Sequence, residues 1–150
     1  MSNFDDYPLS NFDDVGFFHR KFGLPFSPPA QSIADDERKK LKWIDTKTQI
    51  YRITFLQEEL DELENAYINK DLTEVADALI DIVYVAMGTA HMHNLPWEEL
   101  WDEVQQSNLK KERATSVEDS RRMTMLDVVK PKDWQAPRIK SLLRKFGWKS

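Results

Sequence analysis

Apolar positions along the chain recur at spacings of three and four residues, which predicts helices and no convincing strand. Residues 35–68 contain neither Gly nor Pro, so this stretch predicts one long helix or two in close succession. Within it, Leu41 and Phe55 share a helical face with Glu59 and Glu62, so a stripe that begins apolar becomes acidic further along.

A second strong helical pattern follows a polar connection. The segment NKDLTE predicts a turn and a new helix start, with Asp71 as the N-cap and Glu74 at the capping-box distance. This helix runs to about His91 and is apolar on nearly every side, so we expect it to be buried on most sides. Because the connection is short, the two helices are expected to be antiparallel neighbours.

Shorter helices are expected on both sides of this pair. Residues 14–22 predict a helix that ends at Gly23, and NLPWEEL at 94–100 starts another that fades near Lys111. The last residues predict a short amphipathic helix. The expected fold class is therefore all-α, an antiparallel bundle of four to five helices.

The remaining C-terminal segment is polar and is interrupted by Pro131 and Pro137, which predicts an ordered arm or a loop. A chain of 150 residues is a usual size for one domain, and no repeat is visible. We therefore predict a single domain over residues 1–150, with a core of about 12–112 and an extended arm of about 113–150.

Composition narrows the chemistry. The chain is 41% hydrophobic and 31% charged and contains no cysteine, which excludes disulfides, thiolate nucleophiles and Cys-ligated metal sites. The acidic N-terminus lacks the order of a secretory signal, and no run of eighteen apolar residues is free of charge, so we expect a cytoplasmic protein without a membrane partner.

The charge is distributed unevenly. A net charge of -5 argues against a nucleic-acid partner bound through general electrostatics. Residues 1–105 carry 9 Lys or Arg against 21 Asp or Glu, whereas residues 106–150 carry 12 against 5. Either these charges lie on solvated faces, or the acids gather cations and the basic tail meets an anion.

Two acidic patches lie on the two central helices. At about 100° per residue, three glutamates of the first helix share one side, and three acids of the second fall within an arc of about 60°. Because the helices are antiparallel neighbours, the patches can face each other at similar height. The six residues are Glu58, Glu59, Glu62, Glu74, Asp77 and Asp81.

These acids need compensation if they are buried, since an ionised carboxylate then costs several kcal/mol unless it is paired. No basic residue occurs between Lys70 and Lys110, and only Arg52 and Lys70 flank the acids. Protonation could relieve one or two groups, but five or six together indicate divalent cations. Ligation by carboxylates alone favours Mg²⁺ or Mn²⁺.

Other metals fit less well. A di-iron carboxylate bundle needs Glu-x-x-His pairs, whereas this chain has Glu59-x-x-Glu62 and Glu74-x-x-Asp77. His91 and His93 lie about 200° apart on a helix, which disfavours a shared zinc ion. We interpret both as helix-end or surface histidines.

The spacing of these two acidic pairs resembles the MazG-like all-α nucleoside triphosphate pyrophosphohydrolases. That superfamily also includes the dimeric dUTPases and the phosphoribosyl-ATP pyrophosphohydrolases. Further blocks look like those of a MazG-like subgroup found in bacteria and phages, and together they cover most of residues 12–143. The blocks are FHRKFGLPF, EELDELENA, DLTEVADALIDIVYVAMGTA, LPWEELWDEVQQSNLKK and VVKPKDWQAPRI.

The resemblance implies hydrolysis of a nucleoside triphosphate to the monophosphate and pyrophosphate, with water attacking the α-phosphorus. It implies that Glu59, Glu62, Glu74 and Asp77 hold Mg²⁺ or Mn²⁺, with two or more ions per site. Glu58 is then a further ligand or the base that orients water, so the expected catalytic residues are Glu58, Glu59 and Glu62. Asp81 is expected to bind a metal through water or to support a ligand.

The resemblance also gives the basic tail a role. Lys111, Arg113 and Lys130 are expected to bind the triphosphate, and as an alternative they are solvating surface charges. We expect base or sugar contacts from Tyr84, Asn108 and His19, and the corresponding structural alternatives are a core aromatic, a helix cap and a surface residue.

Partners remain to be predicted. An apolar third helix that three others cannot enclose predicts a homo-oligomer. The resemblance implies a dimer or a tetramer, of which we prefer the tetramer, with tails that cross between subunits. The substrate expectation is a deoxynucleotide, dGTP first; the alternatives are phosphoribosyl-ATP and dUTP or dCTP. A non-catalytic helical oligomeric binding module is the alternative of another class. For a phage-encoded protein, the expected location is the host cytoplasm.

Overall fold

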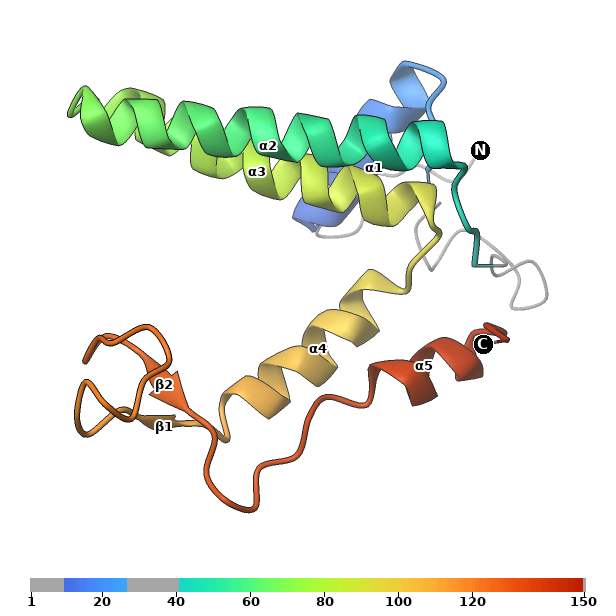
Figure 1. Ribbon diagram of the computed structural model, residues 1–150. Helices are drawn as coiled ribbons and strands as arrows, with labels where there is room; N and C mark the ends of the chain where they lie inside the picture. The colour runs from blue at the N-terminus through green and yellow to red at the C-terminus, as the bar shows by residue number, and fades with distance from the viewer. Residues whose placement is uncertain (1–9, 27–40, 150) are drawn as a thin grey trace. The chain divides into compact units, whose positions relative to one another are not determined.

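The computed structural model describes residues 10–26 and 41–149. This part of the chain is mostly helical, which confirms the all-α class (Figure 1). Its contacts divide the chain into two units, Met1–Leu95 and Pro96–Ser150, and each is described by itself. The elements are α1 (Asn11–Lys21), α2 (Thr46–Ile68), α3 (Leu72–Met92), α4 (Trp97–Asn108), β1 (Glu112–Arg113), β2 (Val128–Val129) and α5 (Ile139–Lys145).

Helix α2 begins later than the absence of Gly and Pro suggested. Asp45 caps it, because its carboxylate accepts the backbone N–H of Thr48 at 2.9 Å. The start at Thr46 corrects the prediction of continuous helix through residues 41–45, and residues 35–40 of that prediction lie outside the described residues. An N-cap carboxylate satisfies N–H groups that the first turn leaves unpaired, so the local sequence decides the boundary.

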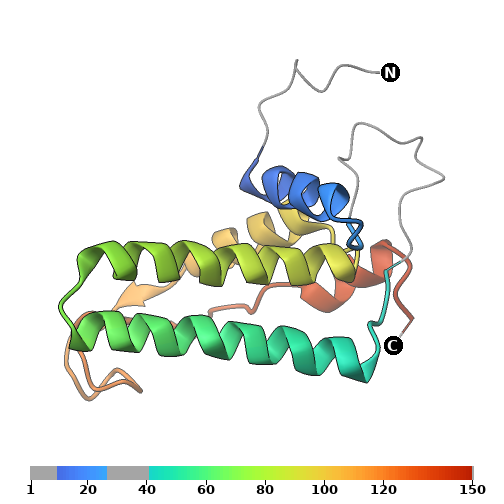
Figure 2. The same cartoon turned by 90° about the horizontal axis from the view of Figure 1, so that it is seen from above.

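The connection between α2 and α3 is a tight reversal. Lys70 takes a left-handed conformation with φ of 56°, and its N–H donates to the Tyr67 carbonyl at 3.1 Å. Asp71 then caps α3, as predicted, by accepting the N–H groups of Thr73 and Glu74 at 3.0 and 3.3 Å. The short reversal makes α2 and α3 antiparallel neighbours, as Figure 2 shows.

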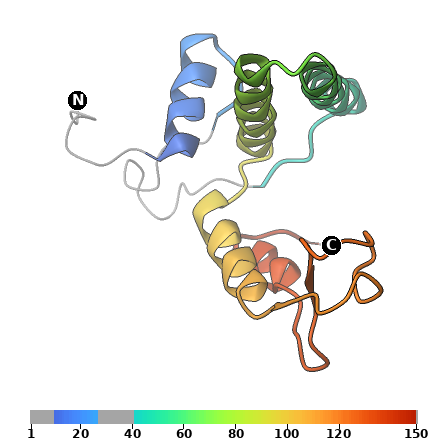
Figure 3. The same ribbon diagram turned by 90° about the vertical axis from the view of Figure 1, so that its left-hand side faces the viewer.

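In the first unit, α3 lies between α1 and α2 (Figure 3). Its buried apolar residues include Val75, Ala78, Val85 and Ala90. The α1–α3 contact is close because α1 carries Gly16 there, where an added Cβ would lie 2.8 Å from the His91 ring. Small residues at such points let helix backbones approach each other.

The prediction that α3 is buried on most sides is wrong for the single chain. Leu72 is 79% exposed and Ile80 is 66% exposed, and Leu79 and Val83 are also exposed. Two neighbouring helices cover only part of a helix surface, so an all-round apolar sequence leaves one apolar face uncovered.

By length and composition, α3 is also apolar enough to cross a membrane, and within the described ranges no other helix is. The core helix of a soluble protein has the same properties, so this observation alone places no part of the chain in a membrane.

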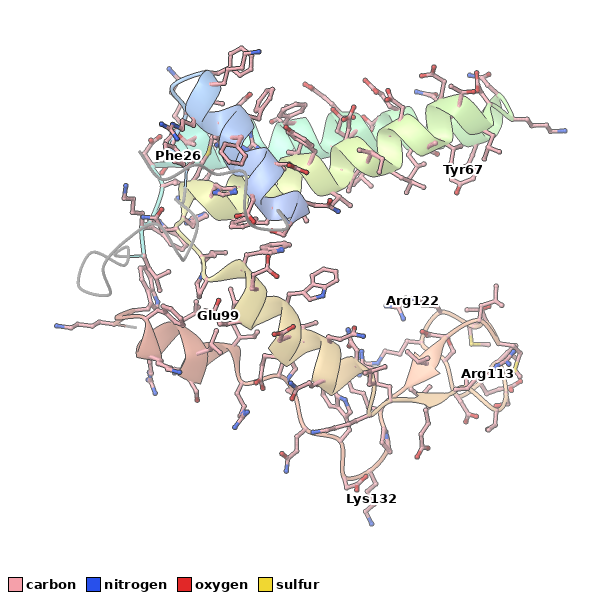
Figure 4. The ribbon with its side chains drawn as sticks, turned by 180° about the vertical axis from the view of Figure 1, so that it is seen from behind. Phe26, Tyr67, Glu99, Arg113, Arg122 and Lys132 are labelled. Carbon is pink, nitrogen blue, oxygen red and sulfur yellow. The ribbon has the colours of Figure 1, made fainter. Side chains whose placement is uncertain are left out.

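The second unit contains α4, α5 and a small hairpin. Strands β1 and β2 pair antiparallel, with Glu112 opposite Val129, and Figure 4 shows Arg113 and Arg122 on this hairpin. Two-residue strands are too short to produce a period-two pattern, which is why the sequence predicted none. Asp127 ties the hairpin loop together by accepting hydrogen bonds from Ser120 at 2.7 Å and Arg122 at 2.9 Å.

The predicted ordered arm is confirmed as a segment held by hydrogen bonds. The indole N–H of Trp134 donates to the Ser107 carbonyl at 2.9 Å, and Arg138 donates to Glu103 at 3.1 Å. The short C-terminal helix is also confirmed, as α5. These contacts fasten the arm to α4.

Candidate active site

Glu59 is the innermost acid on α2. It is 7% exposed, and its Oε2 is buried without a hydrogen-bond partner among the described residues. Burial raises the pKa of Glu59, and the charges of Glu62, Asp81, Asp77 and Glu58 raise it further. A buried carboxylate oxygen without a hydrogen bond lowers the stability of the fold. The described residues supply no partner that would offset this cost.

Four other predicted acids therefore lie near enough to Glu59 for their charges to act on it. We call Glu58, Glu59, Glu62, Asp77 and Asp81 the carboxylate cluster. Glu74 is the exception, because its charge is not among those that act on Glu59. It lies exposed in the first turn of α3, where the helix dipole favours an acid.

The surroundings of the cluster are wetter than predicted. Glu58, Glu62 and Asp77 are exposed and Asp81 is half-buried, so only Glu59 meets the expectation of a dry setting. The reason is the uncovered face of α3, because with only α1 and α2 beside it nothing in this unit shields the rim of the cluster.

The residues fit a hard divalent cation by their chemistry. All five members offer carboxylate oxygens, and the Oε2 of Glu59 has no partner among the described residues. In residues 10–26 and 41–149, however, no three His, Asp or Glu side chains lie close enough together to hold a metal ion. The carboxylates of the cluster are therefore spread apart. Like charges without a counter-ion repel each other, which explains that spread.

The nearest candidate counter-charge on α2 is used elsewhere. Arg52 is 5% exposed, and its Nη2 and Nε donate to the Val85 carbonyl at 2.7 Å and to the Thr89 hydroxyl at 3.0 Å. No carboxylate pairs with it among the described residues. Sequence reasoning missed this buried residue, although it lies seven positions before Glu59 and so on nearly the same side of α2.

His19 lies beside Arg52. It is 2% exposed, which corrects the alternative of a surface histidine, and its Nδ1 hydrogen-bonds the Pro25 carbonyl at 2.6 Å. Burial lowers the pKa of His19, and the positive charge of Arg52 lowers it further. An added Cβ on Gly88 would lie 2.6 Å from His19 Nε2 and 2.9 Å from Arg52 Nη2, so both nitrogens lie against the same glycine.

Aromatic rings adjoin this pair. Tyr84 on α3 meets Phe18 on α1 edge to face, with ring centroids 5.4 Å apart. The Arg52 guanidinium lies 5.5 Å from the Phe55 ring centroid. Burial raises the pKa of the Tyr84 phenol, and Asp14 adds to the effect. The packing supports the core-aromatic alternative for Tyr84, and its role toward a base or sugar stays a prediction.

The other two histidines are structural. His91 is 1% exposed and stacks on Phe12 at 3.7 Å in the last turn of α3, so of the two alternatives predicted for it the helix-end one is confirmed and the surface one is wrong. Its Nε2 hydrogen-bonds the Phe12 carbonyl at 2.7 Å. His93 is the C-cap of α3, as a helix-end histidine was expected to be.

The second unit gathers two of the three predicted phosphate-binding cations. The Nζ atoms of Lys130 and Lys111 lie 4.3 and 5.7 Å from the ring centroid of Trp134. Arg113 lies on β1 and is exposed. Asn108 is the last residue of α4, and its carbonyl accepts the N–H of Lys111 at 3.0 Å; the C-cap is the next residue, Leu109, which corrects the helix-cap alternative by one position.

Fold and site together define a helical protein whose two antiparallel helices carry a cluster of carboxylates around a buried glutamate. Residues 17–108 match the family described as phosphoribosyl-ATP pyrophosphohydrolase, so the chain belongs to this family. This confirms the resemblance to the MazG-like superfamily and supports a nucleotide pyrophosphohydrolase activity in general.

A viral relative also matches. An uncharacterized protein of Acanthamoeba polyphaga mimivirus is 31% identical over 86 residues, which are 57% of this chain and 32% of that protein. The match thus spans about a third of the viral protein's length, and it is consistent with a phage or viral subgroup.

Proposed function

We propose that the protein hydrolyses a nucleoside triphosphate, dGTP first, to the monophosphate and pyrophosphate. Water attacks the α-phosphorus, the bond from that phosphorus to the bridging oxygen of the β-phosphate breaks, and pyrophosphate leaves. The membership in a pyrophosphohydrolase family supports the general class of reaction. The carboxylate cluster on α2 and α3 supports the site.

One observation carries this proposal. Glu59 holds an unpaired carboxylate oxygen inside the first unit while four further acids raise its pKa. Such an arrangement opposes folding unless Glu59 takes up a proton or a cation binds there, and the five acids together favour the cation. Perturbed, clustered acids of this kind are more typical of a functional site than of a packing contact.

Glu59, Glu62, Glu74 and Asp77 would hold Mg²⁺ or Mn²⁺, with Asp81 as support and with Glu58 as the base or, alternatively, as a further ligand. When bound, the ions neutralise charge on the phosphate oxygens and orient the triphosphate, which is most of what phosphoryl transfer requires. Glu74 joins this set through the Glu74-x-x-Asp77 pair on which the resemblance rests, and its side chain is exposed in the first turn of α3.

The chain's own groups supply the rest. Glu58 is exposed beside Glu59 and is the base that orients the attacking water and takes its proton. Lys111 and Lys130, gathered at Trp134, bind the triphosphate, with Arg113 as a third cation. Tyr84, Asn108 and His19 contact the base or the sugar.

A second copy of the chain covers the open face of the first unit in this proposal. Large apolar residues on both central helices stay exposed, and burying them provides the driving force for association. Sedimentation of the purified protein is expected to give a dimer or a tetramer, and a monomer at micromolar concentration would exclude this part. The residues are Ile50, Ile53, Leu60 and Ile68 on α2 and Leu72, Leu79, Ile80 and Val83 on α3.

The test is an incubation with each of the eight common ribo- and deoxynucleoside triphosphates, with Mg²⁺ or Mn²⁺, and with products separated by chromatography. We expect a monophosphate and pyrophosphate in equal amounts. Release of single phosphate would mean attack at a different phosphorus and would overturn the mechanism.

Two alternatives are separated by the same experiment. Phosphoribosyl-ATP belongs in the panel because the family description names it. The nucleotides dUTP and dCTP belong in it because the wider superfamily includes the dimeric dUTPases. A non-catalytic helical module would bind Mg²⁺ and leave every nucleotide intact.

A further inference from the structure

Arg52 and His19 form an unusual polar pair where α1, α2 and α3 meet. Both side chains are more than nine-tenths buried, and both have a nitrogen against Gly88. The structural role of Arg52 is plain, since it joins α2 to the Val85 carbonyl of α3. The Tyr51 and Phe55 rings, with centroids 5.6 and 5.5 Å from the guanidinium, favour its charge, yet no carboxylate pairs with it among the described residues.

The guanidinium has donor capacity to spare. It carries five N–H groups and no acceptor, and its hydrogen bonds to Val85, Thr89 and the Tyr51 side chain use three of them. Among the described residues no carboxylate forms an ion pair with it. Arg52 therefore keeps two guanidinium N–H groups for a further acceptor.

The chemistry of His19 follows from its one hydrogen bond. A carbonyl oxygen can only accept, so the 2.6 Å contact to Pro25 places the proton on Nδ1. A neutral ring with the proton on Nδ1 has a bare lone pair on Nε2, and that atom makes no hydrogen bond within the described residues. His19 therefore offers an acceptor next to the donor of Arg52.

A donor and an acceptor side by side select the group that binds them. A phosphate oxygen would meet the lone pair of His19 and be repelled, so an anion alone does not fit. A carbonyl beside a ring N–H fits both: the carbonyl accepts from Arg52, and the N–H donates to His19. This is the edge that guanine, uracil and thymine present, and resting on the function proposed above, we propose that Arg52 and His19 bind that edge of the nucleobase.

The position of the pair suits this role. Arg52 and Glu59 are seven residues apart on α2, and Asp81 and Gly88 are seven apart on α3, so the pair lies about 10 Å along the helices from the carboxylate cluster. Tyr84 lies between the two places on α3, and a base can stack on such a ring.

The rings that border the pair are open to solvent. Phe18 is 42% exposed and Tyr51 is 55% exposed. Phe18 lies 6.2 Å from the His19 ring, and the Arg52 guanidinium lies 5.6 Å from the Tyr51 ring centroid. The exposed side of the pair is therefore the side from which a base would approach in this proposal.

The amino bases fit less well. Adenine and cytosine could reverse the pairing, with a ring nitrogen toward Arg52 and the amino group toward His19. A ring nitrogen has one lone pair, whereas a carbonyl oxygen has two and can accept more than one guanidinium N–H. The pair therefore favours dGTP, dUTP and dTTP over dATP and dCTP.

The experiment compares kcat/KM for dGTP, dUTP, dATP and dCTP in the wild-type protein and in variants. We expect at least a tenfold preference of the wild type for each keto base over its amino counterpart. Arg52→Lys retains the charge and loses the fork of donors, and His19→Asn retains a donor for Pro25 and loses the lone pair. Each variant is expected to shrink the preference to about threefold or less, through KM more than kcat.

Lys47→Met is the matched control, because Lys47 is an exposed cation on the same helix, outside both sites. It is expected to retain the wild-type preference. Should a variant fold poorly, calorimetric binding of dGMP and dAMP to the wild-type protein without metal remains as a measurement, and dGMP is expected to bind more tightly.

The outcomes separate this inference from the proposed function. If all four triphosphates are hydrolysed at similar rates, or if both variants lower every rate by the same factor, the base-binding role is wrong and the hydrolase stands. If no triphosphate is hydrolysed but dGMP binds more tightly than dAMP in an Arg52-dependent way, the hydrolase is wrong and the base-binding role stands. Equal binding of dGMP and dAMP also overturns the role.

Discussion

The two ends of the α2–α3 pair differ in whether a buried charged side chain has hydrogen-bond partners. At the end that carries Arg52, the cation donates to Val85 and Thr89, and Thr89 itself donates to the Val85 carbonyl at 2.8 Å. At the end that carries Glu59, a buried oxygen has no partner among the described residues, and its neighbours carry the same charge.

The hydrogen bonds of Arg52 stabilise the packing of α2 on α3, whereas the acids around Glu59 destabilise it and form the candidate catalytic site. Hydrogen bonds at the Arg52 end hold α2 against α3, so they fix how the two helices are rotated relative to each other. That rotation then brings the acids of both helices to one place, where repulsion remains uncompensated. Sites that work on charged substrates commonly contain such locally unfavourable arrangements, and the stable part of the fold maintains them.

Replacement of Glu59 by Gln is expected to have the largest effect. Loss of this carboxylate removes the centre of the cluster, so turnover should fall about 100-fold or more. The free energy of unfolding should stay the same or rise, because a repelled buried charge is gone. Assays with the preferred triphosphate and thermal unfolding measure the two quantities.

Glu64→Gln is the matched control, since Glu64 is exposed on α2 and is not among the groups acting on Glu59. It should retain most of the activity. Mg²⁺ should raise the melting temperature of the wild type and of this control, and not that of Glu59→Gln, because only a folded site binds the ion. Nearly full activity in Glu59→Gln would refute the assignment of the site.

Replacement of Arg52 by Met tests the opposite end. It retains much of the side-chain volume and leaves the Val85 carbonyl without its Arg52 donor, so it should cost about 1–3 kcal/mol of stability. Chemical denaturation measures the loss, with Lys47→Met as an exposed control expected to change little. A stable Arg52→Met protein would show that other contacts hold the helices together.

Gly88→Ala sharpens the same comparison. The new Cβ would meet His19 at 2.6 Å and Arg52 at 2.9 Å, and such overpacking typically costs about 1–3 kcal/mol. The better helix propensity of Ala returns about 1 kcal/mol, so a modest net loss is expected in denaturation. A gain in stability would mean that both side chains move aside freely.

The smallest expected effect is a pH dependence from His19. Burial lowers the pKa of the folded histidine below its ordinary 6.5, so below pH 6.5 the unfolded chain takes up a proton that the folded chain resists. This contribution to stability is therefore complete above pH 6.5 and declines as the pH falls toward the lowered pKa. Unfolding free energies of the wild type and His19→Asn, measured from pH 7.5 to 5, should converge toward acid pH.

Local patterns predicted much of this molecule correctly. The Asp71 cap, the antiparallel reversal and the short final helix all depend on a few neighbouring residues. Helical geometry at about 100° per residue likewise placed the acids of each helix on one side. These features depend on contacts close in sequence, which a pattern of residue types can express.

Other features escaped that reasoning because they depend on contacts between distant segments. Arg52 and Val85 are 33 positions apart, and His91 reaches the Phe12 carbonyl across 79 positions. Nothing local to Arg52, His19 or His91 distinguishes a buried polar residue from a solvated one. Their burial follows from how closely Gly16 and Gly88 let the helices approach.

The chain alone determined which helices form, where the two central helices reverse, and which side of each helix carries acids, since all of these follow from short-range geometry and capping. Only the tertiary structure decided that Glu59 is the buried member of its cluster, that Arg52 and His19 meet at one glycine, and that α3 keeps an open apolar face. The physical reason is that burial is a property of packed neighbours, and neighbours from remote segments are set by helix packing.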